Sequence, residues 1–264
     1  MRPKRSFLLC LALGALVTGT SAQDRETALV NAYATLSPHI DRARTALRRD
    51  RLEKCEEEAL FCLDKLPEHQ EAHLFMSQVL YKRGEYGGAL EHIQAAEEGY
   101  LRLTKAHAFL EQQKLRNQAD DVVGLVDDVS VYTEADAAAR ARGSCMPDKY
   151  RKDLEAVKEK LIKEQEERGR TGPAQDFSHI PAIYSHLHGN VLFMLKRPAE
   201  AEEQYRRAIR NDPDCREAYN NLINLLYMDS RVDEARAFLS QAEAHKAQVH
   251  PELKKAVLAR DKLE

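Results

Sequence analysis

Two parts of the chain share one pattern of apolar and polar positions: a helix, a short polar turn, and a second helix with small residues seven apart. Ser185–Asp214 recurs 34 residues later as Tyr219–Gln248, so that Ala201 aligns with Ala235. Apolar residues at spacings of three and four predict amphipathic helices. A period in this range indicates a repeat architecture built from stacked helix pairs.

The same frame fits the N-terminal part of the chain. His73–Ala96 places Gly84, Tyr86 and Ala89 at equivalent positions, and one period earlier Cys55 takes the place of Ala89. The sequence therefore predicts four repeats at residues 36–69, 70–103, 182–215 and 216–249, followed by a helix over Pro251–Leu263.

The period and the residue pattern resemble the tetratricopeptide repeat. In the third unit the resemblance is carried by Gly189, Ala201, Tyr205, Ala208 and the closing Asp212-Pro213. It implies an all-α fold, an α-solenoid of helix-turn-helix repeats, in which the last helix caps an otherwise exposed apolar face. A composition rich in Ala, Leu, Glu, Lys and Arg also favours an all-helical protein.

About 78 residues between the repeat pairs do not fit the frame. Tyr100–Asp120 continues a repeat helix without a breaker, and a shorter helix is expected around Thr133–Arg142. Tyr150, Leu154, Val157 and Leu161 form the stripe of a helix that packs along one partner. We expect a long helical, coiled-coil-like hairpin; two degenerate repeats are the alternative. The expected organisation is 1–22 leader, 23–103 repeat pair, 104–181 insert, 182–249 repeat pair and 250–264 capping helix. Whether the pairs form one solenoid or two lobes stays open.

The N-terminus predicts export. Arg2, Lys4 and Arg5 precede the apolar run Phe7–Val17, and small residues up to Ala22 follow. This is the pattern of a cleaved secretory signal peptide, so we expect a periplasmic or secreted protein, cut after Ala22, without membrane insertion. Cleavage lowers the formal charge from −3 to −6. A net acidic chain without a basic block is a poor nucleic-acid binder.

The five cysteines pose a redox and a metal question. Cys55 and Cys62 are seven residues apart, which on a helix separates them by about 10.5 Å, too far for a disulfide. Neither belongs to a CxxC motif. We interpret them as packing residues; the resemblance gives the same role to Ala89, Ala96, Ala201, Ala208, Ala235 and Ala242. Cys145 and Cys215 lie in predicted loops and are disulfide candidates in an oxidising compartment.

Other site chemistry is weak in the sequence. His69/His73 and His186/His188 do not form a recognised metal-ligand set, and GxSxG, HExxH and phosphate-loop motifs are absent from the printed sequence. We therefore expect neither an enzyme nor a cofactor or bound metal. An enzyme or metal carrier would need the histidines to converge.

The resemblance directs attention to the first helix of each repeat, which in that family lines a concave, peptide-holding groove. Amides and aromatic rings suit this task, although family members also carry an aromatic there for packing. The expected groove residues are Gln78, Tyr81, His186, Asn190, Phe193, Asn220, Asn221, Asn224, Tyr227 and Lys255.

A carboxylate clamp is a sharper version of the same hypothesis. Some members of the family bind a peptide's terminal carboxylate with two asparagines and several cations. Asn190 and Asn221 match the asparagine positions and Lys255 matches one basic position, but His186 and Pro251 replace expected lysines. Loss of those charges weakens carboxylate capture.

The sequence thus predicts a non-catalytic scaffold that binds a protein or peptide on the concave faces of its repeats. The alternative is a structural module in which the central hairpin mediates homo-oligomerisation or docking to an envelope complex.

Overall fold

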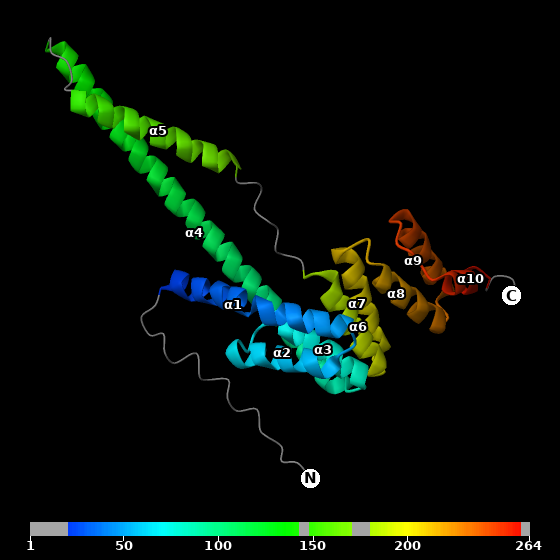
Figure 1. Cartoon of the computed structure of the whole chain (residues 1–264). Coiled ribbons are helices and arrows are strands. Elements are labelled where there is room, and N and C mark those ends of the chain that lie inside the picture. Colours follow the sequence, from blue (N-terminus) through cyan, green and yellow to red (C-terminus); the bar gives the residue numbers. More distant parts are fainter. Residues whose placement is uncertain (1–20, 143–147, 171–179, 260–264) are drawn as a thin grey trace. The chain divides into compact units, whose positions relative to one another are not determined.

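The computed structural model describes residues 21–142, 148–170 and 180–259, and these residues form ten α-helices without a strand (Figure 1). Within these ranges, no helix combines the length and apolar character that crossing a bilayer requires. The helices are α1 (Ala22–Arg48), α2 (Leu52–Lys65), α3 (Gln70–Arg83), α4 (Tyr86–Ala141), α5 (Asp148–Arg170), α6 (Ala182–Met194), α7 (Pro198–Asn211), α8 (Arg216–Met228), α9 (Val232–Ala244) and α10 (Pro251–Ala259).

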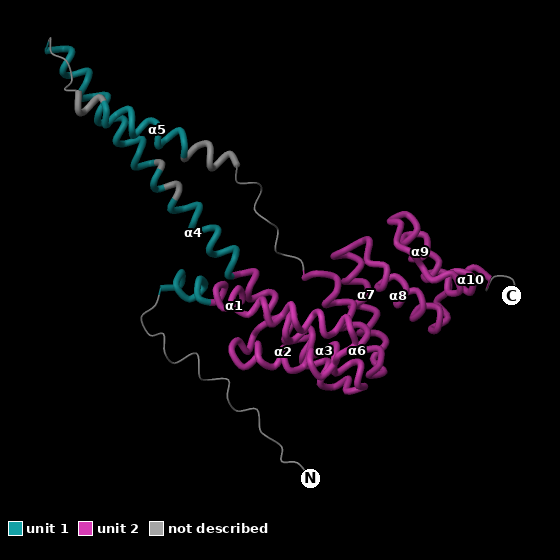
Figure 2. The backbone as a smooth tube through the Cα atoms, viewed as in Figure 1, with its two compact units in different colours: residues 1–28, 106–176 teal, residues 29–105, 177–264 magenta. Residues whose placement is uncertain are grey.

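The chain divides into two compact units (Figure 2). The repeat unit comprises residues 29–105 and 177–264, and the insert unit comprises residues 1–28 and 106–176. Both α1 and α4 contribute residues to each unit.

The repeat unit is one continuous solenoid, which answers the question that the sequence left open. Inside repeats, α6 contacts α7 and α8 contacts α9. Between successive repeats, α2 contacts α3 and α7 contacts α8. Helix α3 also contacts α6 directly. At this junction Leu74 and Ile93 are buried with Tyr184 and Leu187 in one apolar cluster. The first and second repeat pairs therefore share a core although the insert separates them in sequence.

The turn inside each repeat has the same backbone geometry. A left-handed residue lies one or two positions beyond the end of the first helix in all four, with φ of 54° at Asp50, 81° at Gly84, 62° at Lys196 and 60° at Ser230. In each case the next N–H bonds a carbonyl five residues back, as from Arg197 to Leu192 at 3.0 Å. This is the hydrogen bonding of a Schellman-type helix end. Only one of the four positions is glycine, so residue type alone does not reveal that the same turn recurs in each repeat.

The eight predicted packing positions lie inside the solenoid. All are on the second helices of the repeats, and each has a relative exposure of 0%. Small side chains allow neighbouring helices to approach closely there. The eight residues are Cys55, Cys62, Ala89, Ala96, Ala201, Ala208, Ala235 and Ala242.

The C-terminal helix packs onto the last repeat. Helix α10 contacts α8 and α9, and Val257 is fully buried there. Asn220 fixes the preceding loop: its Nδ2 donates to the carbonyls of Arg216 (2.9 Å) and Gln248 (3.0 Å), and its Oδ1 accepts from the N–H of His250 (2.8 Å).

The described part of the insert unit comprises the first residues of α1, the C-terminal part of α4, and α5. The expectation of a separate helix around residues 133–142 was wrong, because α4 runs unbroken to Ala141. No proline interrupts this segment, and alanines fill its last turns, so nothing stops the helix. On α5 the side chains of Leu154, Val157 and Leu161 are half-buried, and the side chain of Tyr150 lies outside the described part of the structure. The packing of the two helices as a hairpin stays a prediction.

Candidate functional site

The candidate site is a pocket of about 260 Å³ that we call the amide pocket. Its lining comes from α3, α6, α7 and α8, so three consecutive repeats contribute to it. The lining residues are Tyr81, Asn190, Phe193, Met194, Tyr205, Asn221 and Asn224.

A hydrogen-bond network orders the floor of the pocket. Oδ1 of Asn190 accepts from the Tyr205 hydroxyl at 2.9 Å and from Nδ2 of Asn221 at 2.7 Å. The amide nitrogens of Asn190 and Asn221 also lie 3.2 and 3.0 Å from Nε2 of His186. Because α6, α7 and α8 each supply members, the network fixes the side chains by linking helices that already pack together.

His186 must be neutral in this arrangement. An amide nitrogen can only donate, so Nε2 accepts both bonds and the ring proton resides on Nδ1. Burial lowers the pKa of His186, while the negative charge of Glu217 acts in the opposite direction. Protonation of Nε2 would break both hydrogen bonds at once.

A second, larger pocket adjoins the first through Phe193, which lines both. This rim pocket has a volume of about 490 Å³. Its lining contains apolar side chains together with charged ones: Phe193, Lys196, Pro198, Ala199, Glu202, Leu225, Met228, Asp229 and Arg231.

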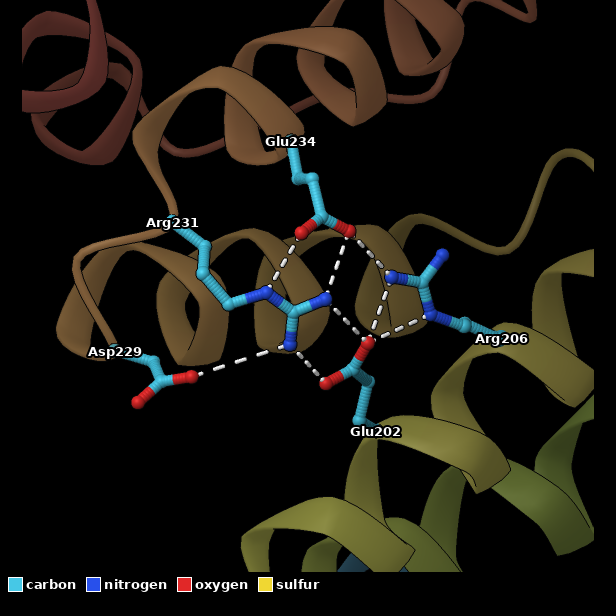
Figure 3. A network of polar contacts seen from close by, with 5 residues as sticks. All are labelled: Glu202, Arg206, Asp229, Arg231 and Glu234. Carbon is cyan, nitrogen blue, oxygen red and sulfur yellow. Dashed lines mark hydrogen bonds and ion pairs between the residues drawn. The ribbon is translucent and has the colours of Figure 1, made fainter.

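Ion pairs join α7 to α9 at the rim pocket (Figure 3). Arg231 donates to Glu202 at 2.6 Å and to Glu234 at 2.7 Å, and Arg206 bonds the same two carboxylates at 2.6 and 3.0 Å. Hydrogen bonds to Glu234 and Glu202 raise the pKa of Arg231. Burial raises the pKa of Glu202, but bonds from both arginines outweigh it and lower the pKa overall. The pocket wall is thus cross-linked between the third and fourth repeats.

Comparison with known proteins agrees with this geometry. A family model described as "Tetratricopeptide repeat" matches residues 186–249, about a quarter of the chain. The chain contains tetratricopeptide repeats at residues 186–249. The prediction of an all-α repeat fold is confirmed.

No curated protein matches the chain. Among solved structures, TTC0263, a thermophilic TPR protein of Thermus thermophilus, is 17% identical with a TM-score of 0.36, covering 86% of this chain and 100% of its own. Pseudomonas aeruginosa pilF is 16% identical with a TM-score of 0.35, covering 91% and 88%. The TPR2AB-domain:pHSP90 complex of yeast Sti1 is 12% identical with a TM-score of 0.24, covering 86% and 95%. At TM-scores this low, these similarities do not bear on function.

The repeats bring six of the ten predicted groove residues together. Tyr81, Asn190, Phe193, Asn221 and Asn224 line the amide pocket, and His186 lies in its network. The sequence missed two lining residues, Met194 and Tyr205. Tyr205 was recognised only as a repeat-pattern residue. The signal for Met194 was its recurrence one period later as Met228 in the rim pocket.

Four predicted groove residues lie elsewhere. Gln78 and Tyr227 are half-buried on α3 and α8 without lining the amide pocket, and Lys255 is exposed on α10. The assignment of Asn220 to the groove was wrong: its side chain is buried and bonded to the backbone before α10. Asn221, its neighbour, points to the pocket instead because successive helical residues face different directions.

The elements of a carboxylate clamp are not assembled around the amide pocket. Of the described residues that line it, none is a lysine or arginine. Pro251 is the first residue of α10, and the two asparagines donate to His186 rather than presenting all of their N–H groups. His186 at an expected lysine position has therefore become part of the protein's own network.

The burial and the raised thiol pKa values of Cys55 and Cys62 argue against a reactive role for these two cysteines. Cys55 and Cys62 have no exposed surface, and burial raises the pKa of each thiol to about 11. Cys215 is half-buried before α8, and Cys145 lies outside the described residues. Their pairing stays a prediction. Among the described residues, no group of three or more His, Cys, Asp or Glu side chains could hold a metal ion.

Two histidines form a dyad between the helices of the second repeat. Nδ1 of His73 lies 2.8 Å from Nδ1 of His92, and Nε2 of His73 lies 2.7 Å from the carbonyl oxygen of Pro67. Because a carbonyl only accepts, His73 carries its proton on Nε2 and accepts from His92 at Nδ1. Burial lowers the pKa of both rings, that of His92 to about 4. The histidine dyad is a neutral structural pair.

Proposed function

We propose that this chain is a non-catalytic scaffold that binds a protein segment along the joined amide and rim pockets. The observation that carries the proposal is the amide pocket itself. It is shared by three repeats and is lined by three aromatic rings and by asparagines, of which Asn190 and Asn224 are equivalent in successive repeats. It adjoins the rim pocket at Phe193. Amides can pair with a peptide backbone, and aromatic faces can cover its side chains.

The mechanism is recognition by a preformed surface. Hydrogen bonds hold Asn190, Asn221 and Tyr205 before a ligand arrives, and packed helices hold the backbone. Binding then costs little receptor ordering, which is the advantage of preorganisation.

Crosslinking tests this function. A photoreactive phenylalanine analogue in place of Phe193 lies where both pockets meet, and a matched probe in place of Phe61, an exposed residue of α2, serves as the control. We expect a partner protein to be crosslinked from Phe193 and lost when Asn190→Ala and Asn224→Ala are combined. Equal crosslinking from both positions, or no effect of the asparagine changes in a folded variant, would refute the groove.

We also propose that the scaffold works outside the cytoplasm. The support is the sequence of residues 1–22, with basic residues, an apolar run and small residues before Ala22. Mass spectrometry of the protein from intact cells and from the exported fraction tests this directly. A chain that keeps its first residues and stays in the cytoplasm would refute export.

The second candidate function is self-assembly through the insert unit. Leu115, Val123 and Val126 are 48%, 59% and 49% exposed on α4, and their spacing places them on one helix face. Exposed apolar residues that share one helix face favour an interface with another protein. Sedimentation of the full chain, compared with Val123→Lys/Val126→Lys, distinguishes this candidate: a wild-type monomer across the accessible concentrations would exclude it.

A further inference from the structure

Part of the hydrogen-bonding capacity of the amide pocket is already used within the protein. Oδ1 of Asn190 already accepts two bonds, from Tyr205 and Asn221. Nδ2 of Asn221 uses both of its hydrogens, one toward Asn190 and one toward His186. What Asn221 leaves for a ligand is its Oδ1, which can only accept.

The charge around this network points the same way. Of the described residues that line the pocket, all seven are uncharged. The charge that acts on the network is the carboxylate of Glu217, which opposes the lowering of the His186 pKa by burial. A bound carboxylate would therefore meet no cation in the lining and could not use the donors of Asn221, which are already bonded within the protein.

Aromatic faces supply the remaining contacts. The rings of Tyr81, Phe193 and Tyr205 line the pocket from three different helices, and the first two are half-buried. Aromatic faces attract cations, most strongly where the cation is partly desolvated. Acceptor oxygens together with rings suit an ammonium or guanidinium group, whose hydrogens are all donors.

Resting on the scaffold function proposed above, we propose that the amide pocket receives a lysine or arginine side chain of the bound protein. The side chain's cationic end lies against the rings of Tyr81 and Phe193 and donates to Oδ1 of Asn221. This selectivity is opposite to that of a carboxylate clamp. His186 is a positioning residue in it, because as a neutral acceptor it takes one hydrogen from each of the two asparagine nitrogens.

The test is a titration of the full chain with three capped amino acids: Nα-acetyl-lysine methylamide, its norleucine counterpart and its glutamate counterpart. Side-chain amide signals of Asn221 and Asn224 in NMR spectra report occupancy of the pocket. We expect the lysine compound to shift both signals saturably, with at least a threefold advantage over norleucine, and glutamate to shift neither.

Charge changes at Asn224 should shift the affinity for the lysine compound in opposite directions. Asn224 is exposed, and its Nδ2 contacts only the sulfur of Met228 at 3.7 Å, so its replacement leaves the network intact. Asn224→Asp should tighten binding of the lysine compound about three- to tenfold, and Asn224→Lys should weaken it by a similar factor. Asn117→Lys, an exposed position on α4, adds the same charge elsewhere and should leave affinity unchanged.

Preference for the glutamate compound, tightening by Asn224→Lys, or the absence of saturable lysine binding would each overturn the proposal. These outcomes differ from failure of the scaffold function. Crosslinking from Phe193 that persists while lysine binding is absent would refute only the charge selectivity. Loss of groove-dependent crosslinking would refute the scaffold itself.

Discussion

Removing one ring at the α3–α6 junction should destabilise the whole solenoid. Tyr184 is 4% exposed, lies in one buried cluster with Leu74 and Ile93, and its ring centroid is 5.6 Å from that of Tyr100. Truncating a buried aromatic residue to alanine costs about 3–5 kcal/mol. For a chain of this size, each kcal/mol lowers Tm by about 2–4 °C, so Tyr184→Ala should lower Tm by about 6–20 °C.

The control is the adjacent residue. Ile183 is 48% exposed, so Ile183→Ala should change the unfolding free energy by no more than about 0.5 kcal/mol. Urea unfolding followed by far-UV circular dichroism measures both variants. Two unfolding transitions in Tyr184→Ala, where wild type shows one, would indicate that the repeat pairs have been uncoupled.

A double-mutant cycle refutes or supports the reasoning most directly. Leu74 on α3 and Tyr184 on α6 belong to the same cluster across the junction. Their alanine substitutions should be non-additive by about 0.5–3 kcal/mol. Additive effects would show that the two repeat pairs fold as independent lobes and that the shared core contributes nothing.

Three further predictions concern single features. Burial holds the pKa of both rings of the histidine dyad below the ordinary value of about 6.5, so the unfolded chain binds more protons than the folded chain. Stability should therefore fall as pH decreases from about 6.5 toward 4. The urea midpoint at pH 5 should be below that at pH 7, and the difference should be smaller in His92→Gln. Gly189→Ala should destabilise by about 1–3 kcal/mol in thermal melts, because its Cβ would lie 2.6 Å from the ring of Tyr205. Cys55 and Cys62 should resist thiol reagents until the chain unfolds, and replacing both by alanine should cost only about 1 kcal/mol per site; rapid labelling of the native protein would contradict their burial.

Much of the candidate site could be predicted because the repeat register places equivalent residues on equivalent surfaces. Asn190, Phe193 and Asn224 followed from that register, as did Tyr81 in the preceding repeat, whereas Asn221 was predicted from the resemblance to a carboxylate clamp. Adjacent helical positions could not be separated in the same way. Asn220 and Asn221 differ by one residue, yet one anchors the loop before α10 and the other enters the pocket.

The role of His186 illustrates a second limit. Its place in the repeat suggested a substitute for a lysine, whereas its partners depend on where Asn190 and Asn221 lie. Hydrogen-bond direction is set by three-dimensional neighbours, so the sequence could not show that donors expected of a clamp would bond to the half-buried ring of His186.

By itself, the sequence determined the repeat period, the helix pairs and the small residues between them, because these depend on contacts within and between neighbouring repeats. Only the tertiary structure decided that α3 meets α6 and that the insert leaves the solenoid's core continuous. That contact joins residues far apart in the chain. Local periodicity carries no information about such a pairing, which is decided by the burial of both apolar faces together.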